Sequence, residues 1–265
     1  MSVKKIGWLI EDGQPGNFIY NEPNPVTINK KKPLSNMAVQ ACPAVNQLES
    51  RYFEVPCPFD LRLRCEKKDT NFEIYSVPEG TRIDEELIKR NLNLMPKDSW
   101  RNEDRPVIQI ECPYAFITDE DIYLTQLPPF LNFNSNYWPG TLISGRFNIT
   151  NWPRTLSWAF EWHDLSQDLI LKRNKPWFYV FFESNNPEDN YKLIEAEYTD
   201  DLRKFKNSML QTPRYVSNTF SLFKTAKNIN KQANMENSME SKDLFMNHHD
   251  RTTIIIATPK AVICS

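Results

Sequence analysis

The stretch Thr155-Leu-Ser-Trp-Ala-Phe-Glu-Trp-His163 decides the fold class, because large apolar side chains occupy every second position along it. In an extended chain these apolar residues share one face, and they are Leu156, Trp158, Phe160 and Trp162. The opposite face carries Thr155, Ser157, Glu161 and His163. A period of two residues is typical of a β-strand with one face buried. The stretch therefore predicts such a strand.

Two neighbouring segments extend this prediction. Residues 142–151 alternate as well, with Ile143, Phe147 and Ile149 on one face. Residues 177–182 form a continuous apolar run, which is typical of a strand buried on both faces. Further strand patterns lie upstream. We therefore expect a mainly β fold, an antiparallel β-sandwich or jelly-roll-like barrel with a C-terminal helical arm.

Composition excludes several classes of site. Glycine is scarce, with 6 residues against 19 prolines, and none lies after Gly145. A Walker phosphate loop, a dinucleotide fingerprint and a Gly-x-Ser-x-Gly nucleophile elbow each need closely spaced glycines, so none of them is possible here. The formal net charge of -2 argues against a general nucleic-acid-binding protein. Apolar runs are too short for a membrane span or a signal peptide, so we expect a cytoplasmic protein, in the host cytoplasm if the chain is viral.

The pattern along the chain predicts its organisation. Residues 58–77 predict a hairpin, and residues 84–94 predict a helix. After a polar linker, residues 192–210 and 212–233 have helical spacing. We therefore divide the chain into a β-domain at 1–183, a helical arm with its linker at 184–250, and a short terminal strand and tail at 251–265.

The helical arm carries an apolar stripe at Val216, Phe220 and Phe223. Burying each such side chain stabilises a structure by about 1.5–3 kcal/mol, so the stripe should pack against something. We expect a homo-oligomer or a protein partner to be bound through residues 187–233, because the arm follows an apparently complete β-domain. The alternative is that the arm completes the core of its own monomer.

Histidine is the scarcest reactive residue, and His163 ends the Trp-rich strand beside Asp164 and two residues after Glu161. The order His163-Asp164, then His248 or His249, then Arg251 resembles the ligand order of iron and 2-oxoglutarate oxygenases. That resemblance implies a metal held by His163 and Asp164. In those enzymes one residue separates the pair, whereas here the two are adjacent and would leave opposite faces of a strand. The alternative is a surface histidine at a strand end.

Two aromatic residues are candidates for ligand binding. Trp158 and Trp162 lie on the apolar face and are expected in the core, whereas Trp138 and Trp152 fall at strand ends and are open to stacking on a ligand. Together with Glu161 and His163, they are the predicted ligand-binding residues. The cysteines of Pro-Cys57-Pro and Glu-Cys112-Pro are expected to pack as small apolar residues, or alternatively to ligate haem iron.

Much of the chain resembles a family of bacterial and phage proteins of unknown function, and the matching features lie at 41–43, 53–59, 113–118, 144–147, 152, 158–162 and 172–182. This family has no assigned catalytic residues that could be transferred. The segments 140–147 and 170–178 are also similar to the late strands of dUTPase-like barrels. The aspartate and serine motifs of those enzymes are not visible, which argues against pyrimidine nucleotide hydrolysis.

No complete catalytic motif is present, so the sequence leaves open whether the protein is an enzyme and which cofactor it would use. We expect a phage-encoded accessory β-domain protein that acts by binding a partner or ligand. One alternative is a metal-dependent jelly-roll enzyme, similar to the iron and 2-oxoglutarate oxygenases, that uses His163. The other is a structural subunit of a virion, for which β-sandwich folds are common.

Overall fold

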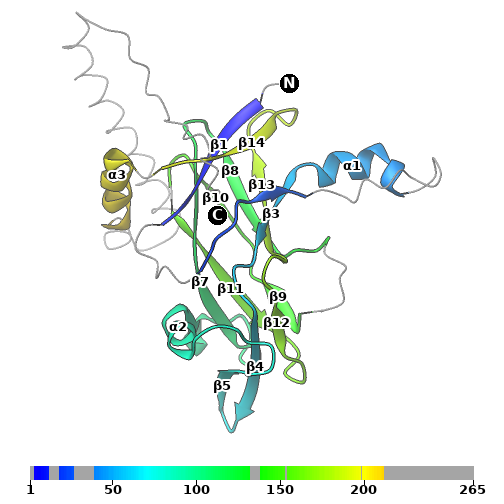
Figure 1. Ribbon diagram of the computed structural model, residues 1–265, viewed down its shortest axis with the longest axis vertical. Helices are drawn as coiled ribbons and strands as arrows, with labels where there is room; N and C mark the ends of the chain where they lie inside the picture. Colours follow the sequence, from blue (N-terminus) through cyan, green and yellow to red (C-terminus); the bar gives the residue numbers. More distant parts are fainter. Residues whose placement is uncertain are drawn as a thin grey trace, which may run out of the picture.

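The computed structural model describes residues 3–11, 18–26, 39–131, 138–152, 154–197 and 199–211. Three sheets form a mainly β structure that curls into a half-barrel (Figure 1), and strand pairing is antiparallel except between β1 and β14. The expected fold class is confirmed. None of the helices in the described ranges has the length and hydropathy of a membrane span.

Sheet A contains the Trp-rich strand. Its strand order is β14 (Asn190–Glu195), β1 (Val3–Ile10), β7 (Val107–Ile117), β11 (Thr155–Trp162) and β9 (Gly140–Leu142), and β6 (Leu92–Leu94) also pairs with β7. The alternation predicted for β11 is confirmed, because Trp158, Phe160 and Trp162 are fully buried. These rings pack closely, and Trp158 stacks on Phe160 with centroids 5.4 Å apart.

Sheet B faces sheet A across the core. Its strand order is β10 (Gly145–Asn148), β8 (Tyr123–Leu127), β13 (Pro176–Glu183), β3 (Tyr52–Pro56) and β2 (Asn24–Pro25). The continuous apolar run of β13 is explained by its position at the centre of this sheet. Phe178, Val180 and Phe182 face the common core, whereas Tyr179 is buried on the opposite face.

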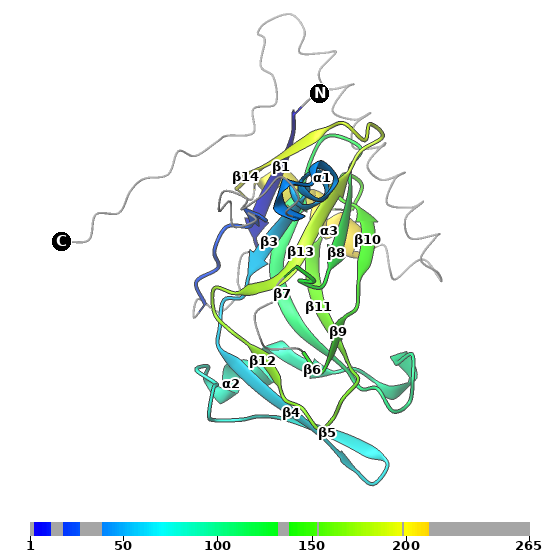
Figure 2. The same cartoon turned by 90° about the vertical axis from the view of Figure 1, so that its right-hand side faces the viewer.

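Sheet C closes one end of the molecule and contains β12 (Leu169–Leu171), β4 (Leu61–Lys68) and β5 (Asn71–Ser76). The predicted hairpin at 58–77 is confirmed as β4 and β5, which turn at Asp69 with a φ of 54°. This hairpin lies at the end of the body away from β14 (Figure 2). Leu61, Leu63 and Cys65 point into the core, and the residues between them point outward.

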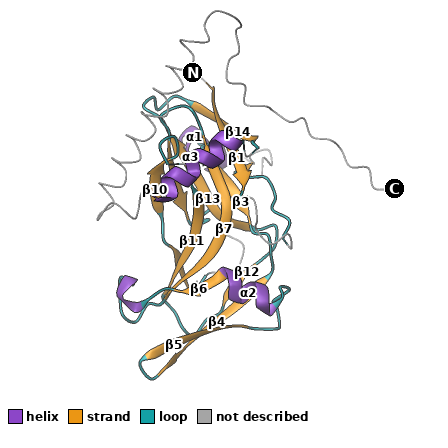
Figure 3. Ribbon diagram, turned by 90° about the vertical axis from the view of Figure 1, so that its left-hand side faces the viewer, coloured by secondary structure: helices purple, strands orange, loops and turns teal. Residues whose placement is uncertain are grey.

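Helices lie outside the sheets. α1 (Pro43–Glu49) projects from the side of sheet B, α2 (Glu85–Asn91) begins at the cap residue Asp84, and the 3-10 helices are Val39–Ala41 and Lys97–Ser99. α3 (Asp200–Gln211) lies across the outer face of sheet A (Figure 3), where Leu202 packs near Leu9 and Ala115.

Three sequence expectations require correction. Residues 142–151 are not one strand, because the chain leaves sheet A after β9 and enters sheet B as β10. Residues 192–195 are not helical, since β14 fills the free edge of β1 and places Tyr191 and Leu193 against the core. The helix predicted at 84–94 ends at Asn91, because the next three residues form β6 and pair with β7.

Candidate binding site at the end of β11

The C-terminal end of β11 brings a buried carboxylate and an imidazole together. Glu161 and His163 are two residues apart, so they leave the same face, and Nε2 of His163 lies 2.8 Å from Oε1 of Glu161. The side chain of Glu161 is only 6% exposed, while that of His163 is 40% exposed. A residue that the sequence places on the polar face is therefore buried.

The segment that leads into β7 lies beside this end of β11. The backbone N–H of Trp162 donates to the carbonyl of Pro106 at 2.9 Å. Directly before it, Nη1 of Arg105 lies 3.8 Å from Oε1 of Glu161, and the Arg105 side chain is about half exposed. The cluster of Glu161, His163 and Arg105 is called the carboxylate site below.

The other side of the site is fixed by β9. The carbonyl of Pro139 accepts hydrogen bonds from the backbone N–H groups of His163 and Asp164, at 2.7 and 2.8 Å. Gly140 comes so close to β11 that a Cβ at this position would lie 2.0 Å from the carbonyl oxygen of Glu161. Only glycine permits this approach, so the sequence of β9 sets the position of the carboxylate site.

One oxygen of the carboxylate site has no partner. Oε2 of Glu161 is enclosed by protein atoms and receives no hydrogen bond from any described residue. An ionised carboxylate has about four lone-pair positions, and leaving one oxygen of a buried carboxylate without a donor is costly. Oε2 of Glu161 is therefore a free hydrogen-bond acceptor among the described residues, and the exposed side chains of His163 and Arg105 lie beside it.

Asp164, the predicted metal partner of His163, is occupied elsewhere. Its carboxylate accepts from the backbone N–H and hydroxyl of Ser166 and from the amide of Gln167, at 2.9, 2.6 and 2.8 Å. These hydrogen bonds, those from Ser166 first, lower the pKa of Asp164. No group of three or more potential metal ligands gathers within the described residues, and His248, His249 and Arg251 lie outside them. A metal at His163 and Asp164 stays a prediction.

The two candidate tryptophans lie apart from the carboxylate site. Trp138 packs edge-on against Trp158 and Phe160, with centroids 5.6 and 6.0 Å away, and therefore lies on the core side of β11. Trp152 precedes the first residue of β11 and stands 5.2 Å from the guanidinium of Arg154. Since a strand rises about 3.3 Å per residue, β11 places His163 about 26 Å from Thr155, the strand's first residue, and Trp152 precedes that end. The predicted ligand-binding residues thus form one pair and two separate tryptophans.

The structure places Cys57 and Cys112 in the core, at 1% and 3% exposed. Burial raises the pKa of both thiols, that of Cys112 to about 12. Thiols in this state pack as small apolar side chains and are poor nucleophiles.

A second buried carboxylate, Asp168, lies on the outer face of sheet C. Nε of Arg62 lies 2.6 Å from its Oδ2, and Arg64 donates from Nε to Oδ1 at 2.7 Å and from Nη2 to Oδ2 at 3.0 Å. The Asp168 side chain is 9% exposed, and the arginines, Arg64 first, lower its pKa. Both oxygens therefore have donors.

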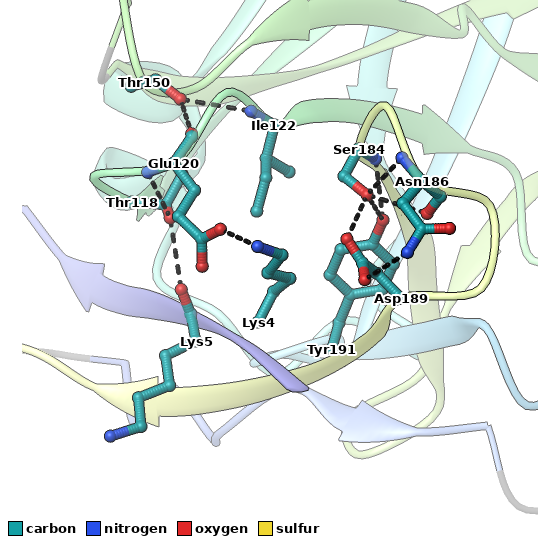
Figure 4. Close-up of polar contacts among 10 residues, drawn as sticks. All are labelled: Lys4, Lys5, Thr118, Glu120, Ile122, Thr150, Ser184, Asn186, Asp189 and Tyr191. Atoms are coloured by element: carbon teal, nitrogen blue, oxygen red, sulfur yellow. Dashed lines mark hydrogen bonds and ion pairs between the residues drawn. The ribbon is translucent and has the colours of Figure 1, made fainter. Parts of the chain in front are cut away.

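Polar side chains also gather around β1 and the loop between β13 and β14 (Figure 4). Lys4 of β1 pairs with Glu120 in the acidic turn before β8. Nearby, Asp189 accepts from the hydroxyl of Ser184 at 2.8 Å and from the amide of Asn186 at 3.1 Å. Because each of these carboxylates has a donor, the cluster holds β1 and the β13–β14 loop in place.

The comparisons with known proteins give no match to a family model, to a curated protein or to a solved structure. The functional argument therefore rests on the geometry of the carboxylate site. Sequence reasoning found two of its residues, Glu161 and His163, but missed Arg105. No local pattern marks Arg105, which reaches the site only because β7 pairs with β11.

Proposed function

We propose that this protein is an accessory β-domain protein that acts by binding, and that the carboxylate site contacts its ligand. The observation that carries the proposal is the enclosed Oε2 of Glu161, which has no hydrogen-bond donor among the described residues. A fold selected for stability alone gains nothing from such a group, because an apolar side chain of similar volume avoids the desolvation penalty. A ligand that supplies a donor removes that penalty.

The charge of the site defines the kind of ligand. Arg105 lies close enough to balance the negative charge of Glu161, so a second cation gains little there. Glu161 therefore lacks a hydrogen-bond donor at Oε2, and it does not lack a positive charge nearby. We therefore propose a neutral ligand that carries a hydroxyl or amide N–H group. It would approach past the exposed side chains of His163 and Arg105, which contact Oε1, and donate its hydrogen bond to Oε2.

The metal-dependent alternative is less well supported by this geometry. A divalent ion at Glu161 would stand beside the guanidinium of Arg105, and the carboxylate of Asp164 is engaged by its own turn. A phage origin and a role in the virion rest on the sequence alone, and the neighbouring genes would separate an accessory protein from a virion subunit.

Thermal unfolding of the full chain tests the proposed ligand class. The probes are glucose and acetamide as neutral donors, n-butylammonium as a cation, and zinc as a metal. We expect glucose or acetamide to raise the midpoint of wild-type unfolding and to lose this effect in Glu161→Leu. The matched control, Glu79→Leu, changes an exposed carboxylate and should respond as wild type does. The proposal is wrong if neither neutral probe acts through Glu161, or if only zinc does.

We also propose that the chain associates with a second copy through residues 187–233. The described part of this arm packs on its own β-domain, where α3 places Leu202 beside Ala115 and pairs Lys206 with Glu11. Self-association therefore falls to the segment after α3, and its stripe of Val216, Phe220 and Phe223 lies outside the described residues. Sedimentation velocity of the full chain tests this, since a monomer at all concentrations contradicts it.

A further inference from the structure

The outer face of sheet B carries a second aromatic cluster, separate from the core. Tyr52, Phe130, Tyr179 and Phe181 make up this aromatic face, and the ring of Tyr52 stands 5.3 Å from those of both Phe130 and Phe181. Phe130 also contacts Tyr179 edge-on at 5.6 Å. None of the four belongs to the core cluster, which takes the alternate residues of β3 and β13. Tyr52 and Tyr179 are buried, at 9% and 2% exposed, so the accessible part of the aromatic face is formed by Phe130 and the half-buried Phe181. Exposed aromatic rings are typical anchors for a partner.

Apolar side chains at the edge of the aromatic face are exposed. Phe130 is 46% exposed, and Leu48 of α1 is 52% exposed. α1 buries none of its own residues, although it projects directly from this side of the molecule (Figure 2). A short helix without a packed face is not stable by itself in water, so α1 is well placed to pack on something else.

The aromatic face is also acidic. Oε2 of Glu49, at the end of α1, is enclosed and has no donor in the ranges that the structure describes, and burial raises the pKa of Glu54 on β3. The pKa of Tyr179 is raised by burial and then by Glu54 and Glu49, so both carboxylates lie close to the rings. Lys175 offsets part of this charge. Aromatic rings and carboxylates together favour cationic side chains, which bind to both.

This chain contains a segment of matching chemistry. Residues 212–233 contain no aspartate or glutamate, and their four cations are Arg214, Lys224, Lys227 and Lys231. The same segment carries the apolar stripe of Val216, Phe220 and Phe223. Its charge and its apolar side chains are therefore complementary to the aromatic face.

The placement of α3 indicates which copy supplies the segment. α3 lies on the outer face of sheet A, whereas α1 stands on the opposite side of the molecule (Figure 1). Two packed sheets with a helix layer on each side are about 30 Å across. From Gln211 to Val216 the chain spans at most about 18 Å, even when fully extended. Val216 would therefore not reach the aromatic face of its own chain by this route, so the whole stripe docks there only if a second copy supplies it.

We propose that residues 212–233 of a second copy dock on the aromatic face of sheet B, with Lys224, Lys227 and Lys231 near Glu49 and Glu54. This inference rests on the proposed self-association and identifies its receptor surface. Two copies that exchange these segments form a closed dimer with two equivalent contacts.

A charge exchange in the full chain tests the docking. One variant combines Glu49→Lys with Glu54→Lys, and the other combines Lys224→Glu, Lys227→Glu and Lys231→Glu. Like charges across an interface are costly, so we expect each variant alone to self-associate at least roughly tenfold more weakly than wild type. An equal mixture should form a 1:1 heterodimer, because every contact then again joins opposite charges. Sedimentation velocity measures both effects.

The control pair is Glu79→Lys with Glu103→Lys, two exposed carboxylates in loops away from sheet B, and it should associate as wild type does. If a lysine variant loses its wild-type circular dichroism, Glu49→Gln with Glu54→Gln replaces it and should weaken association without the charge reversal. A monomeric wild-type chain contradicts both self-association and docking. Wild-type association by the folded variants, or no heterodimer on mixing them, contradicts the docking alone.

Discussion

Two buried carboxylates, Asp168 and Glu161, differ in what surrounds them. Asp168 stands between two arginines that supply donors to both of its oxygens. Glu161 has an imidazole at one oxygen, a guanidinium 3.8 Å from the same oxygen, and no donor at the other from the described part of the chain. The two side chains are almost equally buried, at 9% and 6% exposed. Burial alone therefore does not distinguish a structural carboxylate from one that is available for binding.

The difference follows from where the partners come from. Arg62 and Arg64 lie on the outward face of β4, and β12 pairs with that strand directly after Asp168, so the sheet itself aligns the three residues. Arg105 comes from the segment before β7 and points toward only one oxygen of Glu161. Regular strand pairing supplies donors to both oxygens of Asp168, whereas the irregular segment before β7 brings Arg105 near only one oxygen of Glu161.

The largest expected change in the free energy of unfolding comes from removing the carboxylate of Asp168. Asp168→Ala removes the carboxylate that both arginines share, and because the arginines are partly solvated we expect the free energy of unfolding to fall by about 2 kcal/mol. Urea denaturation measures this. The control is Asp104→Ala, whose exposed pair with Lys67 should contribute about 0.5 kcal/mol or less. Equal losses in the two variants would show that the arginine pair adds nothing beyond a surface ion pair.

Glu161→Leu should change the free energy of unfolding in the opposite direction, by raising it. The substitution removes an enclosed oxygen without a donor, while Arg105 and His163 are exposed enough to be solvated. We expect the free energy of unfolding to rise by about 1 kcal/mol, as when buried charges are replaced by apolar residues of similar volume. Glu161→Gln, which keeps the shape but adds an N–H group, serves as the matched variant. A loss of stability in Glu161→Leu would mean that the carboxylate is structural, as in Asp168.

Acid should weaken the contribution of Asp168 to stability. Arg64 and Arg62 hold the pKa of Asp168 below its ordinary value, which is about 3.9 in an unfolded chain. Its contribution to stability is therefore complete above that pH and is lost as the pH falls through the lower, folded-state pKa. We expect the difference in unfolding free energy between wild type and Asp168→Asn to shrink below about pH 4. Denaturation with urea over a pH series measures this, and a constant difference would contradict the assignment.

The sequence predicts the strand that carries the site better than it predicts the site. Alternation places Glu161 and His163 on the face opposite Trp158, and the structure confirms this. That Glu161 is buried was not predictable, because its cover arrives from a segment 56 residues earlier and depends on long-range pairing. Gly140 permits the close approach of β9, but in the sequence a lone glycine at the start of a strand is a weak signal.

The predicted boundaries of helices and strands were wrong where one sequence pattern fits both a helix and a strand, or two separate strands. Lys192-Leu193-Ile194 is too short an apolar run to distinguish a helix from a strand, and the free edge of β1 decided for the strand. A better signal lay slightly downstream, where the hydroxyl of Thr199 accepts from the backbone N–H of Leu202 and begins α3. The alternation predicted over 142–151 fails at the change of sheet, because β9 places Leu142 and not Ile143 in the core, whereas Phe147 of β10 packs against it.

The smallest expected effect separates binding from stability at the carboxylate site. Arg105 is about half exposed and lies 3.8 Å from Glu161, so Arg105→Ala should change the free energy of unfolding by no more than about 0.5 kcal/mol. Among the described residues, the same variant leaves Glu161 with His163 as its one partner, and the site then carries an unbalanced negative charge. We therefore expect n-butylammonium to stabilise Arg105→Ala in thermal unfolding, although it does not stabilise wild type. Arg101→Ala, an exposed arginine earlier in the same segment, is the control and should behave as wild type. If the cation acts equally on wild type and on Arg105→Ala, charge balance by Arg105 is not what sets the preference for a neutral donor.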